Sequence, residues 1–416
     1  MKLKKFLLRY YPPGIGLEYM QNQEVKTKMI DLIDLTQKTD VQELAEKIAE
    51  NEPLITQNIM GQLCDTLERL KKKLRDASGK LFQKHLTFKT HILPLTNVAF
   101  DKNGRRCITG SYDRTCKIWD VDVGKELHTL EGHKNVVYSV AFNMPTCNRI
   151  LTGSFDMTAK LWCAETGNCL RTFWGHTSEV VTAKFDSKHQ IIVTGSMDRT
   201  ARIFDVLTGQ ETGTLKGHTG EVIAVNFDNT GNQLITGSFD GTVSVWDTRT
   251  NKRVGVLIGH REEVSNCLYN FDCSIIASSS VDKTAKIWDP RMFTCMATIT
   301  GHDSEVLDIA FDCCGKRLAT ASSDCTACVW DVSSNYKLLS TMEGHTEEVS
   351  QVTFNPAGTQ LLTTSNDKTG RLWNPDTGCC VQVLSGHTDE VCSGVFSYNG
   401  DIIMTASKDN TCKIWK

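Results

Sequence analysis

The chain of 416 residues repeats three residue types that together could catalyse acyl transfer. In one copy, His133 is followed by Thr152 and, four residues later, by Asp156. A hydroxyl nucleophile, an imidazole base and an orienting carboxylate form the catalytic triad of many hydrolases. Here the set occurs in eight copies, and a nucleophile gains nothing from such repetition. We therefore interpret these residues as structural, and we expect no enzyme, no catalytic residue, no cofactor and no metal site.

The elements that position these residues follow a regular period. The dipeptide Gly-His ends at seven histidines, from His133 to His387, with steps of 42 or 43 residues. The first of the eight repeats has no Gly-His dipeptide. We assign its start to His91, which precedes Phe100 by nine residues, as His133 precedes Phe142. Short β-branched runs separated by Gly, Asn and Asp turns indicate strands within each repeat. The period therefore indicates an array of β-structured repeats.

This period, with its Gly-His start and Trp-Asp end, resembles the WD-repeat family over residues 81–416. The resemblance implies an all-β fold, an eight-bladed WD-repeat β-propeller. It also implies that a histidine, a hydroxyl, an aspartate and an aromatic residue form a hydrogen-bonded tetrad in each blade. These tetrads are, in chain order, His91, Thr109, Asp113 and Trp119; His133, Thr152, Asp156 and Trp162; His176, Thr194, Asp198 and Phe204; His218, Thr236, Asp240 and Trp246; His260, Ser278, Asp282 and Trp288; His302, Thr320, Asp324 and Trp330; His345, Thr363, Asp367 and Trp373; and His387, Thr405, Asp409 and Trp415.

Local patterns predict two further features of the ring. Apolar residues lie four and nine positions after each histidine, as Val180 and Phe185 do after His176, with a small or apolar residue at position seven. These steps break strict alternation and predict a β-bulge near the start of each innermost strand. Because the sequence ends at Lys416, after the third predicted strand of the last repeat, we expect residues 81–90 to supply the fourth strand. That pairing would close the ring and cover both open edges.

The first eighty residues contain no repeat and show helical periodicity. Val41, Leu44, Ala45 and Ile48 predict one helix, with Thr39 and Asp40 as candidate caps and Pro53 beyond its end. A second apolar series predicts a helix from about residue 54 that ends near the basic residues 71–75. We therefore predict a small N-terminal α-helical domain over residues 1–80, followed by the propeller over residues 81–416.

Composition excludes several classes of partner. Lys and Arg number 46 against 49 Asp and Glu, so the net charge of -3 does not favour nucleic acid. The 17 cysteines are scattered among apolar runs, which favours a reducing compartment. The apolar run near the N-terminus is interrupted by Arg9, and no long uncharged apolar stretch follows. We expect a soluble intracellular monomer that binds proteins and does not bind nucleic acid or membranes.

Two sets of residues are candidates for binding a protein partner. The position three residues after each histidine is glutamate in six repeats, and this ring of negative charge favours a basic segment of a partner, unless it serves only solubility. These residues are Glu179, Glu221, Glu263, Glu305, Glu348 and Glu390. The position before each tetrad aspartate is apolar in the first repeats, where an exposed arc of anchors is expected: Tyr112, Phe155, Met197 and Phe239.

The opening residues M-K-L-K-K-F-L-L-R-Y-Y-P-P-G, the helical segment and the ending I-W-K are also similar to WD-repeat dynein assembly factors. This resemblance implies an adaptor that links outer dynein arms to intraflagellar transport complex B, located in the cytoplasm, the cilium or flagellum and the basal body. An alternative is a substrate receptor of a cullin-type ubiquitin ligase. The sequences Trp246-Asp247-Thr248-Arg249 and Trp288-Asp289-Pro290-Arg291 resemble the W-D-x-R pattern of such receptors.

Overall fold

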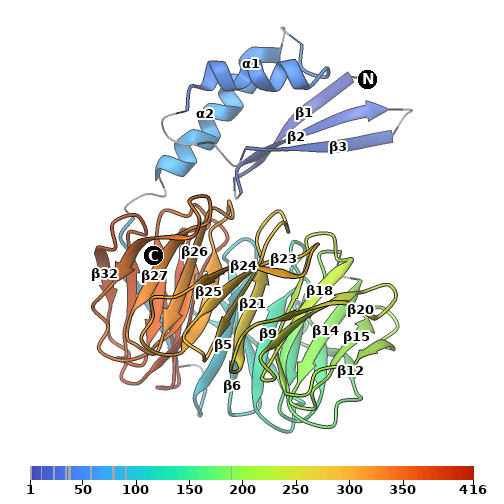
Figure 1. Cartoon of the computed structure of the whole chain (residues 1–416), viewed down its shortest axis with the longest axis vertical. Coiled ribbons are helices and arrows are strands. Elements are labelled where there is room, and N and C mark those ends of the chain that lie inside the picture. The colour runs from blue at the N-terminus through green and yellow to red at the C-terminus, as the bar shows by residue number, and fades with distance from the viewer. Residues whose placement is uncertain are drawn as a thin grey trace. The chain divides into compact units, whose positions relative to one another are not determined.

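Thirty-two of the strands form eight antiparallel sheets of four strands each, which are the blades of a β-propeller (Figure 1). The computed structural model describes all residues except 1, 11, 22–23, 33–34, 36–38, 57–58, 77–79, 90 and 189. Two compact units are present: residues 1–80 with 356–360, and residues 81–355 with 361–416. The predicted eight-bladed all-β propeller is confirmed.

Each blade is a meander in which consecutive strands pair. Blade 1 contains β5 (Leu95–Phe100), β6 (Arg106–Ser111), β7 (Cys116–Asp120) and β8 (Glu126–Leu130). Blade 2 contains β9 (Val137–Phe142), β10 (Arg149–Ser154), β11 (Ala159–Cys163) and β12 (Cys169–Phe173). Blade 3 contains β13 (Val180–Phe185), β14 (Ile191–Ser196), β15 (Ala201–Asp205) and β16 (Glu211–Leu215). Blade 4 contains β17 (Val222–Phe227), β18 (Gln233–Ser238), β19 (Thr242–Asp247) and β20 (Lys252–Ile258).

The second half of the ring repeats this order. Blade 5 contains β21 (Val264–Tyr269), β22 (Ile276–Ser280), β23 (Ala285–Asp289) and β24 (Thr294–Ile299). Blade 6 contains β25 (Val306–Phe311), β26 (Arg317–Ser322), β27 (Ala327–Asp331) and β28 (Lys337–Met342). Blade 7 contains β29 (Val349–Phe354), β30 (Leu361–Ser365), β31 (Gly370–Trp373) and β32 (Cys380–Leu384). Blade 8 contains β33 (Val391–Phe396), β34 (Ile403–Ser407), β35 (Thr411–Trp415) and β4 (Lys84–Lys89).

The first strand of every blade lines a central channel and begins with a β-bulge. In blade 3 the pairing of β13 with β14 skips from Val180 to Thr182, and the equivalent step is irregular in the other seven blades. The bulges that the spacing of apolar residues predicts are therefore present. They turn the residues five and six positions after each histidine towards the channel, and position eight also reaches it at Ala141 and Lys184.

The hydrophobic core lies between blades, because each sheet buries its faces against its neighbours. One cluster, for example, joins Ile108, Ile118 and Leu130 of blade 1 to Val137 and Trp162 of blade 2. Adjacent sheets thus share their apolar side chains. The loss of one strand would expose the core on both sides of it.

Strand β4 joins the two ends of the ring. It pairs antiparallel with β35, and Cys412 lies opposite Phe88. Backbone hydrogen bonds in both directions between Gln83 and Lys416, at 2.8 and 2.9 Å, extend the pairing. Phe88 is 4% exposed and stacks on Trp119 of blade 1, with ring centroids 5.1 Å apart. Strand β4 therefore completes blade 8 and fills the core between blades 8 and 1.

The N-terminal unit contains the two predicted helices together with a sheet that the prediction did not include. Helices α1 (Val41–Asn51) and α2 (Met60–Asp76) are present, but a sheet of β1 (Lys2–Arg9), β2 (Gly14–Gln21) and β3 (Glu24–Asp31) precedes them. Asp40 caps α1, since its Oδ1 accepts a hydrogen bond from the backbone N–H of Gln42 at 2.8 Å. Helix α2 begins later than predicted, because the chain first turns at residues 52–56. None of the described helices is long and apolar enough to cross a bilayer.

The core of this unit explains why sheet and helices occur together. Ile15 and Leu17 of β2 are completely buried, as are Leu63 and Leu67 of α2, and all four belong to one cluster. The helices thus bury their apolar stripes against the sheet. The apolar periodicity predicts both helices, whereas the sheet that their apolar faces cover is found only in the structure.

Candidate functional site

In every blade, the histidine, hydroxyl and aspartate of the tetrad form a chain of hydrogen bonds. In blade 4, His218 Nδ1 lies 2.8 Å from Asp240 Oδ2, and His218 Nε2 lies 2.7 Å from the Thr236 hydroxyl. The indole N–H of Trp246 donates to the same hydroxyl at 2.8 Å. Corresponding distances in the other blades lie between 2.7 and 2.9 Å for both histidine contacts. The structure therefore brings together all eight predicted sets.

The direction of these bonds fixes the protonation of the histidine. An indole can only donate, so the Thr236 oxygen accepts from Trp246. Among the described residues, His218 Nε2 is the acceptor within reach of the Thr236 hydroxyl proton, so the hydroxyl donates to it. The other ring nitrogen, Nδ1, then carries the hydrogen and donates it to Asp240. This arrangement requires a neutral imidazole and an ionised carboxylate.

The pKa directions agree with this assignment. Burial lowers the pKa of His218 despite the neighbouring carboxylate. Burial alone would raise the pKa of Asp240, but hydrogen bonds from Thr242, the backbone of Thr219 and His218 outweigh it and lower the pKa to about 2. The threonine two residues after each aspartate is thus a fifth member of the network. In blade 4, Thr242 donates from its hydroxyl at 2.6 Å and from its N–H at 2.9 Å.

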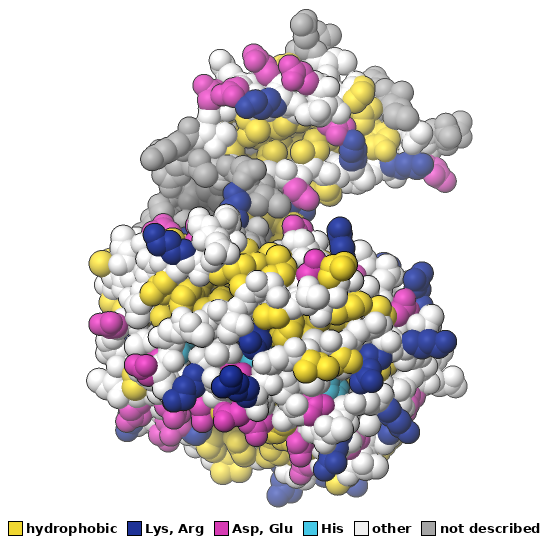
Figure 2. Space-filling view, viewed as in Figure 1, with side chains coloured by type: hydrophobic (Ala, Val, Ile, Leu, Met, Phe, Trp, Pro, Cys, Tyr) yellow, Lys and Arg dark blue, Asp and Glu magenta, His cyan; other side chains and the backbone are white. Residues whose placement is uncertain are grey.

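Burial prevents this chain of bonds from acting as a hydrolytic triad. The hydroxyl residue of every tetrad is 0% exposed, including Thr152 and Thr236. A nucleophile must touch its substrate, and no substrate can reach these oxygens without unfolding the blade. Histidine is accordingly almost hidden on the surface in Figure 2. The arrangement satisfies buried polar groups and holds the turns of each blade.

Blade 3 is an exception, because Phe204 replaces the tryptophan and cannot donate to Thr194. Phe173 of blade 2 lies against Phe204, with ring centroids 5.1 Å apart. At the equivalent interface between blades 3 and 4, these two positions are occupied by Leu215 and Trp246, which belong to one cluster. The larger neighbour thus fills the space left by the smaller ring. Blade 1 keeps its network through His91, while Thr90 lies outside the described residues.

The two sets of candidate partner-binding residues lie side by side on one face of the propeller. In every blade the backbone N–H of the residue before the tetrad aspartate donates to the carbonyl of the residue three after the histidine. The N···O distance is 2.9 Å from Phe239 to Glu221 and 3.0 Å from Met197 to Glu179. We call this side, which carries the tetrad turns, the tetrad face.

The acidic ring on the tetrad face is only partly compensated. Glu390 forms an ion pair with Lys408, and Glu348 accepts a hydrogen bond from the Asn366 side chain at 3.2 Å. In the described part of the chain, no cation pairs with the other glutamates: Glu179, Glu221, Glu263, Glu305 and Glu348. The uncompensated negative charge therefore extends without interruption from blade 3 to blade 7.

The apolar arc lies on the same face over blades 1 to 4, and it overlaps the acidic residues in blades 3 and 4. Tyr112 is 42% exposed and Phe239 is 40% exposed, whereas Phe155 and Met197 are half-buried. Phe155 stacks on Tyr138 at 5.2 Å between ring centroids. Tyr138, itself 42% exposed, was not among the predicted residues, because it occupies the bulge position of β9 and no repeat pattern marks it.

Two other sequence features are exposed elsewhere. Trp174 is the one tryptophan outside the tetrads, and 66% of its surface is exposed. Arg249 and Arg291 of the W-D-x-R sequences are exposed in turns after third strands, on the face opposite the tetrads. Among the described residues, no group of three or more His, Cys, Asp or Glu side chains could hold a metal ion.

Comparison with known proteins identifies similar chains. The family model described as WD domain, G-beta repeat matches eight segments: residues 82–120, 124–163, 167–205, 209–247, 251–289, 293–331, 336–374 and 378–416. A crystal structure of the computationally designed Ika8 protein superposes with a TM-score of 0.72 and 29% identity, covering 80% of this chain and 99% of that chain.

Curated relatives share a shorter segment at higher identity. The protein named dynein assembly factor with WD repeat domains 1 is 58% identical over 145 residues in Macaca fascicularis, covering 35% of each chain. The proteins of the same name from Mus musculus and Homo sapiens are 56% and 55% identical over 150 residues, covering 36% of each chain. The matched segment therefore spans about a third of the length of these relatives.

Proposed function

The chain belongs to the WD40 repeat family, and from this membership we propose that it is a non-enzymatic adaptor in the assembly of axonemal outer dynein arms. Its partners are proteins: outer-arm subunits and intraflagellar transport complex B. It acts as a monomer in the cytoplasm and in the cilium or flagellum, including the basal body. The name shared by the relatives from three mammals supports the dynein-assembly role.

The observation that carries the adaptor proposal is the contrast between buried and exposed groups on the tetrad face. Every tetrad hydroxyl is buried, so these residues serve the fold. Around them, aromatic side chains and unpaired carboxylates remain accessible. Aromatic anchors beside charged groups are typical of surfaces that bind proteins.

The distribution of charge suggests which partner segment fits this face. Apolar side chains would pack on Tyr112 of blade 1 and on Phe239 of blade 4, which are 42% and 40% exposed. Basic side chains would contact Glu263 and Glu305, where no cation of the described chain competes for them. A segment with an apolar anchor and flanking Lys or Arg residues therefore fits best.

A second candidate function is that of a substrate receptor for a cullin-type ubiquitin ligase. Its support is the exposure of Arg249, whose side chain is 75% exposed and lies 3.5 Å from Asp247. Arg291 occupies the equivalent turn of blade 5 and is also exposed. Two accessible arginines on one face could contact a propeller adaptor of the ligase.

Affinity purification from ciliated cells separates the two functions. Outer-arm dynein and transport subunits are expected with the wild-type chain, and their loss is expected with Y112S/F239S. A matched control is L207S, which removes an apolar side chain that is 69% exposed in a turn on the opposite face. Recovery of a cullin with its adaptor, abolished by R249E/R291E, would instead support the ligase. Equal recovery of dynein subunits with Y112S/F239S would reject the tetrad face as their binding site.

A further inference from the structure

The central channel holds a cavity of about 420 Å³ whose polar groups come from the first strands of the blades. The position six residues after each histidine faces it, and seven of the eight side chains there are polar or charged: Asn97, Ser139, Thr182, Asn266, Asp308, Gln351 and Ser393, with Ala224 as the eighth. We call these residues the channel ring.

Some residues of the channel ring form hydrogen bonds between neighbouring blades. Asp308 of blade 6 accepts a hydrogen bond from the Asn266 amide of blade 5 at 2.7 Å and from the Val352 N–H of blade 7 at 3.1 Å. Gln351 Oε1 accepts from the Gly394 N–H of blade 8 at 2.9 Å. These bonds between blades account for the acceptor atoms of Asp308 and Gln351 in the channel ring. They do not account for the hydrogen-bond donors that also face the cavity.

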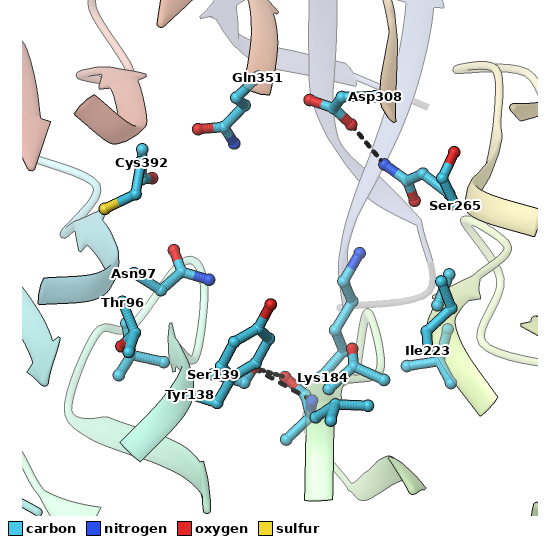
Figure 3. Close-up of a pocket in the computed structure, with 18 of the residues that line it drawn as sticks. Thr96, Asn97, Tyr138, Ser139, Lys184, Ile223, Ser265, Asp308, Gln351 and Cys392 are labelled. Carbon is cyan, nitrogen blue, oxygen red and sulfur yellow. Dashed lines mark hydrogen bonds between the residues drawn. The ribbon is translucent and has the colours of Figure 1, made fainter. Parts of the chain in front are cut away.

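Lys184 is a donor without a structural explanation. It lies eight residues after His176, and the equivalent residues of the other blades carry no charge: Ala99, Ala141, Asn226, Leu268, Ala310, Thr353 and Val395. Figure 3 shows its side chain extending into the cavity, with Asp308 and Gln351 on the opposite wall. Its ammonium group forms no ion pair or hydrogen bond within the described part of the chain. The Lys184 side chain is exposed within the open channel, and desolvation by the surrounding walls lowers its pKa.

Further donors face the same cavity with their hydrogens unused. Ser393 is only 3% exposed, and its hydroxyl has no hydrogen-bond partner among the described residues. The Gln351 amide nitrogen and the Tyr138 hydroxyl also form no hydrogen bond with the described residues. Burial raises the pKa of Tyr138, so its hydroxyl keeps its proton. A channel site with a cation and surplus donors is complementary to an acceptor-rich anion.

From this geometry we propose that the channel binds an oxyanion, a carboxylate or phosphate group, with Lys184 as its charge partner and Tyr138 and Gln351 as hydrogen-bond donors. The group belongs either to a small metabolite or to the free C-terminus of a peptide, because both present the same acceptors. Lys184 also lines a second cavity of about 370 Å³ beyond the channel, bounded by β13 and β17. A ligand that enters from that side meets the ammonium group first.

The test is calorimetric titration of the full chain with succinate, inorganic phosphate, and a pentapeptide with either a free or an amidated C-terminus. We expect saturable binding of at least one oxyanion and at least tenfold weaker binding by K184M. The variant K184R keeps the charge and should bind within about threefold of wild type. Preference for the free over the amidated peptide would assign the site to a chain terminus, whereas preference for succinate or phosphate would assign it to a metabolite.

Measurements on three variants separate binding from folding. K184M should melt at nearly the same temperature as wild type, because the exposed Lys184 side chain pairs with none of the described residues. D308N removes the like charge opposite and should bind the oxyanion about threefold more tightly. The control K252M removes an exposed lysine of the outermost strand β20 and should change nothing. No saturable binding, unchanged binding by K184M, or weaker binding by D308N would each overturn the proposal.

Discussion

The backbone N–H of Phe239 donates a hydrogen bond to the carbonyl oxygen of Glu221 at an N···O distance of 2.9 Å. The same bond recurs in all eight blades and joins the turn before each tetrad aspartate to the loop after each tetrad histidine. The networks that hold the turns therefore also hold the surface around the channel. The stability of the blades and the binding of a partner to the tetrad face are consequently linked. Each variant must therefore be tested for both folding and binding.

Loss of one tetrad carboxylate should destabilise its own blade. In D240A, His218, the Thr242 hydroxyl and the backbone N–H groups of Thr219 and Thr242 all lose their acceptor. Leaving these donors buried should cost about 3 kcal/mol in the free energy of unfolding, measured in urea. Hydrogen exchange should accelerate most in β18 and β19.

The matched control for this change is D376A. Its side chain is 71% exposed and pairs with Arg317 at the surface, so less than about 1 kcal/mol should be lost. If D240A were as stable as D376A, the tetrad would not have the structural role assigned to it.

The exception in blade 3 predicts coupling between two core positions. F204W alone should overpack against Phe173 and cost about 2 kcal/mol. The double variant F173L/F204W recreates the leucine and tryptophan of blades 3 and 4 and supplies an indole donor for Thr194. It should recover most of the loss, with a coupling energy above about 1 kcal/mol in a double-mutant cycle. Additive effects would mean that the two rings do not compensate each other.

The free energy of unfolding should contain a pH-dependent contribution from Asp308. Burial raises its pKa to about 6 in the folded chain, despite hydrogen bonds from Val352 and Asn266. A raised pKa means that the folded state binds a proton more readily than the unfolded state. Stability from this group therefore increases as the pH falls from about 7 to about 4. Because channel water weakens the effect, we expect about 1 kcal/mol.

The measurement is the difference in unfolding free energy between wild type and D308N across this range. The difference is needed because lowered pKa values of the tetrad histidines, such as His218, act in the opposite direction. Those residues gain protons on unfolding below about pH 6.5, so acid reduces stability through them. A wild-type advantage over D308N that does not grow on acidification would contradict the assignment.

Truncation should show that β4 closes the ring. A chain that starts at residue 81 should fold cooperatively, because its compact unit keeps β4 and Phe82. A chain that starts at residue 90 loses the strand paired with β35 and the ring stacked on Trp119. We expect it to aggregate through the exposed edge. Light scattering and urea unfolding would detect this, and a monomeric, cooperatively folded chain from residue 90 would refute the closure.

The sequence predicts the propeller well because every repeat contains its own copy of the tetrad and its own turns. Those residues act locally, so their spacing is enough to place them. The sheet of the N-terminal unit was missed, although alternation in Glu24–Asp31 and the turn before Gly14 were visible. The residues of β3 other than Ile30 are exposed, so the helices give the stronger apolar pattern.

The channel site could not be predicted from the repeat itself. Lys184 and Asp308 stand out as charges at positions that are neutral in other blades. Whether such a side chain points to the channel depends on the bulge after Val180, which shifts the alternation by one residue. Tyr138 likewise gains its place beside Phe155 through the bulge of its own strand.

The most direct measurement of the central claim is electron tomography of axonemes from cells that lack this chain. We predict that outer dynein arms are missing while inner arms remain, and that re-expression of wild type or L207S restores them. Y112S/F239S, folded to the same melting temperature, should fail to restore them. A full complement of outer arms without the chain would contradict its role in their assembly.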